Sequence, residues 1–135
     1  MARLFNIFIS HSWGYDNDYE TLTRFLDEYP YFNWRDYSVP KDDPIHNARS
    51  RAALRDALKE KIRHASCVIV PARVCCSSSD WIREEINIAL EMEKPIIGIR
   101  PWGAYYISTL VQDNAIDIVG WKKESIVNAI KDYSI

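Results

Sequence analysis

The chain has 135 residues, of which 47% are hydrophobic and 27% are charged, a composition typical of a globular protein large enough for one core. With 17 basic and 19 acidic residues and a formal charge of -2, the sequence excludes a broad basic surface for nucleic acid or an anionic membrane. Its apolar runs are too short for a membrane span or a signal peptide, so we expect a single cytoplasmic domain over residues 1–135, with neither nucleic acid nor membrane as a partner.

Short apolar runs alternate with amphipathic stretches along the chain. In the first half, Pro30 ends a helical pattern, and the prolines within residues 38–44 exclude an inner strand there. The predicted elements are a strand from Leu4 to Ile9, a helix from Asn17 to Tyr29, a strand from Phe32 to Tyr37 and a helix from Ala48 to Ala65.

The second half continues the alternation. Its predicted elements are strands over Cys67 to Val70, Pro95 to Ile99 and Ile116 to Val119, and helices over Trp81 to Glu93, Ile107 to Val111 and Lys122 to Tyr133. This pattern predicts an α/β fold: a flavodoxin-like, doubly wound, five-stranded parallel sheet in the order 2-1-3-4-5. Ligands of such sheets bind where the winding reverses, so the loops after Ile9 and Val70 should form the walls of a site.

This sequence does not contain the residues that several reactions common in this fold require. The first strand is followed by Ser10, His11 and Ser12 rather than by acidic residues, which excludes a phosphorylated receiver. The four glycines form neither a GxGxxG pattern nor a P-loop, so a glycine-rich phosphate cradle is excluded as well. The histidines and cysteines show no metal-ligand spacing, and we therefore expect no metal and reduced thiols.

The helix predicted after residue 80 separates two neighbouring carboxylates. At roughly 100° per residue, Glu84 points about 160° away from the apolar stripe and Glu85 only about 60°. We therefore expect Glu84 to be solvated, and Glu85 to lie in the crevice at the edge of the core, one helical turn from Trp81. A carboxylate at such a border either pairs with a cation or works in a site, and the helical pattern leaves both open.

Four separated segments, in the right order over nearly the whole chain, resemble a known family. They are Ile9 to Trp13, Tyr37 to Pro40 with Asp43 and Pro44, Trp81 to Glu85, and Pro95 to Ile99 with Pro101 to Gly103. The first resembles the opening box of TIR domains, and the third resembles the TIR helix that carries a catalytic glutamate four residues after a tryptophan. Together they resemble the TIR-like proteins of bacterial Thoeris antiphage defence, of the ThsB type.

The resemblance implies an enzyme that cleaves the nicotinamide-ribose bond of NAD+ and, in Thoeris proteins, recloses ADP-ribose into a cyclic signal. Plain ADP-ribose and a cyclic isomer both stay open as products of this chain. NAD+ would be a substrate, so no cofactor is expected. The implied partners are an effector protein reached indirectly through the nucleotide signal, a phage-derived trigger and a second copy of the chain in a homo-oligomer. Glu85 takes the place of the catalytic glutamate, and the expected substrate-binding residues are Ser10, His11, Ser12, Trp13, Tyr37, Ser38 and Trp81.

Structural interpretations of the same residues stay open. Ser10 and Ser12 could merely cap the turn after the first strand, and His11 could be a solvated loop residue. Trp34 and Trp102 are interpreted as packing residues. Two rival functions also remain: a non-catalytic TIR-type interaction module, and a nucleoside deoxyribosyltransferase.

Overall fold

The computed structural model describes residues 3–10, 16–38, 50–72, 80–102 and 106–135. Only the backbone is described for five of these residues, namely Asp16, Asn17, Arg51, Asp80 and Trp81. Of the predicted site residues, His11, Ser12 and Trp13 lie outside the described residues, and so does the side chain of Trp81.

A single sheet of five strands organises the described residues. Its strands are β1 (Leu4–Ile9), β2 (Asn33–Asp36), β3 (Cys67–Pro71), β4 (Ile96–Ile99) and β5 (Asp117–Val119). They lie in the order β2-β1-β3-β4-β5, and every neighbouring pair is parallel. The predicted fold class and strand order are therefore confirmed.

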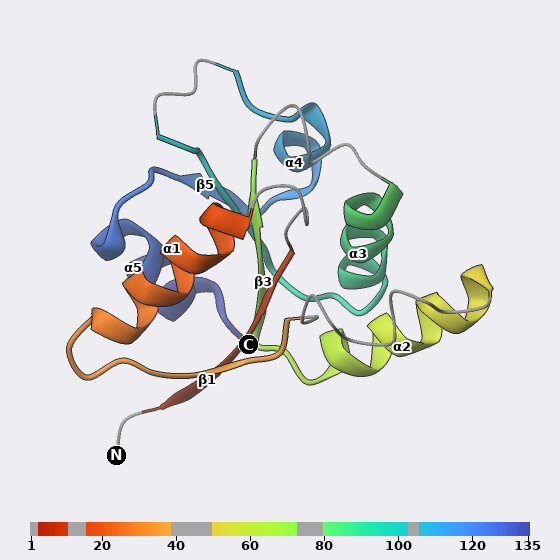
Figure 1. The fold of residues 1–135 in the computed structure, drawn as a ribbon, viewed down its shortest axis with the longest axis horizontal. Coiled ribbons are helices and arrows are strands. Elements are labelled where there is room, and N and C mark those ends of the chain that lie inside the picture. Colours follow the sequence, from red (N-terminus) through yellow and green to blue (C-terminus); the bar gives the residue numbers. More distant parts are fainter. Residues whose placement is uncertain (1–2, 11–15, 39–49, 73–79, 103–105) are drawn as a thin grey trace.

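Helices cover both faces of the sheet (Figure 1). One face carries α1 (Asp16–Glu28) and α5 (Lys123–Tyr133), and the other carries α2 (Arg51–Arg63), α3 (Asp80–Glu91) and α4 (Thr109–Asn114). Among the described helices, none combines the length and the apolar character needed to cross a lipid bilayer.

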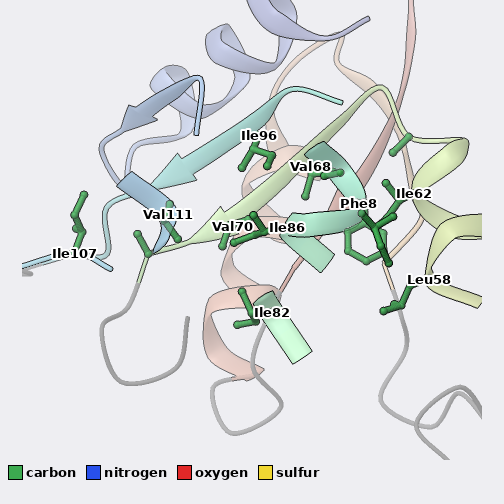
Figure 2. Packing of buried hydrophobic residues seen from close by; sticks show 14 residues of the cluster. Phe8, Leu58, Ile62, Val68, Val70, Ile82, Ile86, Ile96, Ile107 and Val111 are labelled. Carbon is green, nitrogen blue, oxygen red and sulfur yellow. The ribbon is translucent and has the colours of Figure 1, made fainter. Parts of the chain in front are cut away.

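The hydrophobic core has two halves, because alternate residues of each inner strand point to opposite faces of the sheet. Val68 and Val70 of β3 pack with α2, α3 and α4, whereas Cys67 and Ile69 pack with α1 and α5. Figure 2 shows the first half, where Ile82 and Ile86 of α3 lie among residues from the sheet and from α2. This packing fixes the buried face of α3.

The observed helices differ from the predicted bounds by one to three residues at one or both ends, and α2 and α4 differ most, for local reasons. Helix α2 begins later than expected, because the Ser50 side chain accepts a hydrogen bond from the Ala53 N–H and caps the first turn. Helix α4 begins after Ser108, which caps it in the same way by accepting from the Val111 N–H at 3.5 Å. Ile107 therefore precedes the helix, and its side chain packs into the core.

Candidate functional site

A buried pair of polar side chains lies where the winding of the sheet reverses. The Ser10 hydroxyl, directly after β1, donates a hydrogen bond of 2.7 Å to Oε1 of Glu85 on α3. Ser10 is 0% exposed and Glu85 is 1% exposed. Two residues 75 positions apart thus meet at the edge where ligands of doubly wound sheets bind.

Each partner of this pair is fixed by its own secondary-structure element. The Ser10 N–H donates to the Ile69 carbonyl at 2.8 Å, which extends the pairing of β1 with β3 by one residue. Glu85 lies on the face of α3 that also buries Ile82 and Ala89, both at helical spacing from it. The prediction that Glu85 lies on the core side of α3 is confirmed, but the residue is buried within the core rather than at its edge.

A tight turn after β2 supports the other side of β1. The Ser38 N–H donates to Oδ1 of Asp36 at 2.8 Å, and the Ser38 hydroxyl oxygen accepts from the Ile9 N–H at 2.9 Å. Because β2 ends at Asp36, this hydroxyl takes the place of a strand carbonyl next to Ile9. Ser38 therefore holds the last residue of β1, immediately before Ser10.

The tyrosine of α1 braces the same turn. Tyr19 donates a hydrogen bond from its hydroxyl to Oδ2 of Asp36. Partial burial, and to a smaller extent this hydrogen bond to a carboxylate, raise the pKa of the Tyr19 phenol. The phenol therefore keeps its proton and stays a donor. Sequence analysis missed both Tyr19 and Asp36, although an Asp two residues before a Ser is typical of a turn closed by the Asp side chain.

The neighbouring carboxylate, Glu84, differs from its prediction. Its side chain is 14% exposed rather than solvated, and it forms an ion pair with Arg55 of α2, which also pairs with Glu91. The hydrogen bond that Arg55 donates to Glu84 raises the pKa of the Arg55 guanidinium. The helical pattern of α3 could not reveal this contact, because the cation belongs to another helix. Glu84 and Glu85 thus meet different partners, a guanidinium and a hydroxyl.

Tyr37 is held beside β1 but faces another neighbour. Its N–H donates to the Ile7 carbonyl at 2.9 Å, and its ring stacks on the imidazole of His64 with centroids 6.1 Å apart. Among the described residues, the structure brings Ser10, Ser38 and Glu85 to one end of β1 and adds Tyr37 only through the backbone. The substrate-binding roles of Ser10, Tyr37 and Ser38 stay predictions.

The two tryptophans interpreted as packing residues differ from each other. Trp34 is half-buried, packs against the core on the α1 side and donates from Nε1 to Asp27 at 2.8 Å, as the packing interpretation requires. Trp102 is 81% exposed, so the packing interpretation is wrong for it. Trp102 follows a buried residue, Pro101, shortly after the end of β4.

Two cavities that are lined by described residues lie away from the Ser10–Glu85 pair. One, of about 480 Å³, is lined by the start of β2 and by Leu4 and Asp27. The other, of about 350 Å³, is lined by the start of β4 and by residues of the C-terminus. Both cavities border the amino ends of strands, whereas ligands of this fold bind at the carboxyl ends.

Within the described part of the chain, no group of three or more His, Cys, Asp or Glu side chains is placed to hold a metal ion.

Solved structures resemble this fold at low sequence identity. A conserved protein from Enterococcus faecalis V583 has a TM-score of 0.63 and 11% identity, covering 96% of this chain and 99% of its own. The CMP N-glycosidase BcmB of Clostridium botulinum has a TM-score of 0.54 and 20% identity, covering 95% of this chain and 99% of its own. A search of curated protein sequences gave no match.

A family match covers the site itself. Residues 8–106 match the family described as Thoeris protein ThsB, TIR-like domain. The matched range includes the end of β1 with Ser10, the turn with Ser38 and all of α3 with Glu85. The chain therefore belongs to the TIR-like domain family of the Thoeris protein ThsB.

Proposed function

We propose that this protein is an NAD+ nucleosidase that cleaves the nicotinamide-ribose bond, with Glu85 as its catalytic carboxylate. The observation that carries the proposal is the buried hydrogen bond between Ser10 and Glu85 at the carboxyl end of β1. The family match supports it. The fold likeness to a CMP N-glycosidase supports it as well, since that protein's name describes cleavage of the same class of bond.

A carboxylate suits the chemistry of this bond. When the bond between ribose C1′ and the nicotinamide nitrogen breaks, the electron pair goes to the ring nitrogen and the ribose becomes cationic at C1′. A fixed negative charge in a site of low dielectric stabilises that cation more strongly than water does. Because nicotinamide leaves as a neutral molecule, no second acid has to protonate it.

The serines have complementary tasks in this proposal. The Ser10 hydroxyl orients the Glu85 carboxylate, and its donated hydrogen bond favours the charged form of that group. The Ser38 hydroxyl accepts from the Ile9 N–H, and in this proposal it donates its own proton to a ribose hydroxyl. His11, Ser12, Trp13, Tyr37 and Trp81 complete the proposed substrate site.

The product is a cyclic isomer of ADP-ribose in this proposal. Cyclisation requires that a hydroxyl or an adenine nitrogen of the same molecule reaches C1′ before water does. The cyclic product would carry the signal of antiviral defence to a separate effector protein in the cytoplasm, and a phage-derived trigger and assembly into a homo-oligomer would control the reaction. NAD+ acts as the substrate throughout, and no cofactor is required.

Release of nicotinamide from NAD+ tests the proposal, with the adjacent glutamates as a matched pair. Glu85→Gln should lower the rate by about 100-fold to 1000-fold, because the charge that stabilises the transition state is lost. Glu84→Gln should leave the rate nearly unchanged, because its carboxylate pairs with Arg55. Equal losses in both variants would contradict the assignment of Glu85.

Mass spectrometry of nucleotides from phage-challenged cells extends this test to a protein that needs a trigger. Cells with the wild-type chain should lose NAD+ and gain a cyclic ADP-ribose isomer, and cells with the Glu85→Gln form should do neither.

Purified protein incubated with CMP provides the competing test. Release of cytosine without release of nicotinamide would show that the substrate is a pyrimidine nucleotide and not NAD+.

A further inference from the structure

Two exposed aromatic side chains stand beside the proposed catalytic end of the sheet. Trp102 is 81% exposed and Tyr106 is 82% exposed, both on the connection between β4 and α4. Aromatic rings are costly to leave in water, since they bury 150–250 Å² each when packed. Two of them on one connection make this connection a candidate place for a ligand to contact the protein.

Both ends of this connection are fixed to the sheet. At its start, the Arg100 N–H donates to the Val119 carbonyl at 2.8 Å. At its end, the Ser108 N–H donates to the Ala72 carbonyl at 3.1 Å, and Ile107 is 9% exposed within the core. Trp102 and Tyr106 are each within two residues of such an anchor. Their backbone positions are thus set by the fold.

The aromatic pair and the catalytic pair lie on opposite sides of one strand end. Ser10 pairs with Ile69 of β3, and Ser108 pairs with Ala72, which directly follows β3. In Figure 1 the described residues between β4 and α4 lie toward the top of the view, where β3 also ends. Strands β1 and β4 are two strand spacings apart, roughly 10 Å, and an extended dinucleotide is longer than that.

A cationic side chain, Arg100, is two residues before Trp102. Arg100, the first residue after β4, is exposed, and its guanidinium has no ion pair among the described residues. A guanidinium binds phosphate oxygens, and an aromatic face stacks on a nucleobase. A cation followed by two aromatic rings thus has the chemistry that a purine nucleotide requires.

We propose that Arg100, Trp102 and Tyr106 form a subsite for the adenylate half of the substrate. Arg100 binds a phosphate, and Trp102 and Tyr106 stack on the adenine base. This inference rests on the proposed function for the identity of the whole substrate, but the subsite itself recognises adenosine monophosphate alone. The nicotinamide riboside half then extends across the end of β3 toward Ser10 and Glu85.

Calorimetric titration with adenosine monophosphate tests the subsite without any catalysis. The dissociation constant should rise roughly tenfold in Trp102→Ala and in Tyr106→Ala, because each removes a stacking face. Tyr31→Ala is the matched control, since Tyr31 is 96% exposed but lies at the opposite end of the sheet, just before β2. Arg100→Gln should weaken binding of adenosine monophosphate and leave binding of adenosine unchanged.

Kinetics with two substrates connect the subsite to the reaction. Trp102→Ala should raise KM for NAD+ and leave KM for nicotinamide mononucleotide unchanged, because the mononucleotide has the same scissile bond without the adenylate half. Adenosine monophosphate that fails to bind the wild type, or binds Trp102→Ala equally well, would overturn the subsite. So would a Trp102→Ala variant that changes only the oligomeric state in sedimentation velocity, which would assign the rings to self-association.

The two proposals fail differently. If Glu85→Gln retains full NAD+ cleavage while Trp102→Ala loses adenosine monophosphate, the catalytic assignment is wrong and the subsite stands. If Glu85→Gln abolishes cleavage while Trp102→Ala binds adenosine monophosphate normally, the subsite is wrong and the catalytic assignment stands.

Discussion

A buried serine lies at each end of the central strands β1 and β3, and the hydroxyls of these two serines have different hydrogen-bond partners. At the amino end, Ser66 accepts from the Asn6 N–H at 3.3 Å through its hydroxyl oxygen, and its carbonyl accepts from the Ile135 N–H at 3.1 Å. At the carboxyl end, the Ser10 hydroxyl donates to the Glu85 carboxylate at 2.7 Å. One serine completes the backbone pairing, and the other holds a charged side chain.

This difference distinguishes a structural polar group from a candidate functional one. A hydroxyl bonded to the backbone satisfies groups that would otherwise be buried without partners, and it adds only stability. A hydroxyl bonded to a buried carboxyl group holds a side chain whose desolvation is costly. Such buried carboxyl groups occur in structural polar networks and in functional sites, and the substitutions below separate the two.

Shortening the carboxylate at the carboxyl end should have the largest effect. Glu85→Asp keeps the charge but moves it by one methylene away from Ser10 and from the expected position of C1′. We expect nicotinamide release to fall about 100-fold, since a displacement of about 1 Å can cost that much in rate. Glu84→Asp is the control, and an unchanged rate in Glu85→Asp would show that placement of the charge does not matter.

The amino end should respond to alkaline pH through Cys67, which follows Ser66. Burial raises the pKa of the Cys67 thiol from 9.0 to about 11. The unfolded thiol loses its proton first, so the stabilisation is complete below pH 9 and is lost as pH rises through about 11. Two pKa units correspond to about 2 to 3 kcal/mol.

Chemical denaturation between pH 7.5 and 11 measures this effect. Tyrosines also titrate in this range, so the quantity to compare is the slope of the unfolding free energy against pH in the wild type and in Cys67→Ala. The slope should be shallower in the variant. Parallel slopes would show that the thiol titrates alike in the folded and unfolded states.

Removing the donor at the carboxyl end should have a moderate effect. Ser10→Ala should lower kcat for NAD+ roughly tenfold, because a hydrogen bond to a charged group is lost. The acid limb of the pH–rate profile should also move to higher pH, since the donated hydrogen bond favours the ionised carboxylate. A lower thermal stability with an unmoved pH profile would assign Ser10 a purely structural role.

The matching change at the amino end should have the smallest effect on activity. Ser66→Ala should cost about 1 kcal/mol of unfolding free energy, because the Asn6 N–H loses its acceptor. Its kcat and its pH–rate profile should equal those of the wild type. A tenfold loss of kcat in Ser66→Ala would remove the distinction between the two ends.

The fold could be predicted because its signals are local. Short apolar runs and amphipathic stretches alternate, and parallel strands joined by helices allow few arrangements. The structure confirms the five strands and their order. The predicted bounds of α2 and α4 were wrong because a serine cap, at Ser50 or Ser108, determines where each helix begins.

The candidate site could be predicted only where one helix or one strand contains the signal. The apolar stripe of α3 placed Glu85 at the core, but the partner of Glu84 is on α2 and could not be read from α3. The exposure of Trp102 was missed because large aromatic side chains usually pack in the interior, whereas Trp102 is 81% exposed. Contacts between distant segments require the three-dimensional arrangement.

The absence of a side chain at Gly98 in β4 has a consequence for α4. A methyl group there would lie 2.7 Å from Cγ1 of Val111 and 3.1 Å from Cγ1 of Ile118. Any larger residue at position 98 would therefore force the side chains of Val111 in α4 and Ile118 in β5 to shift. The N–H of the same Val111 donates to the Ser108 hydroxyl oxygen that caps α4. One missing carbon atom in β4 thus lets the strand pack closely against the first turn of that helix.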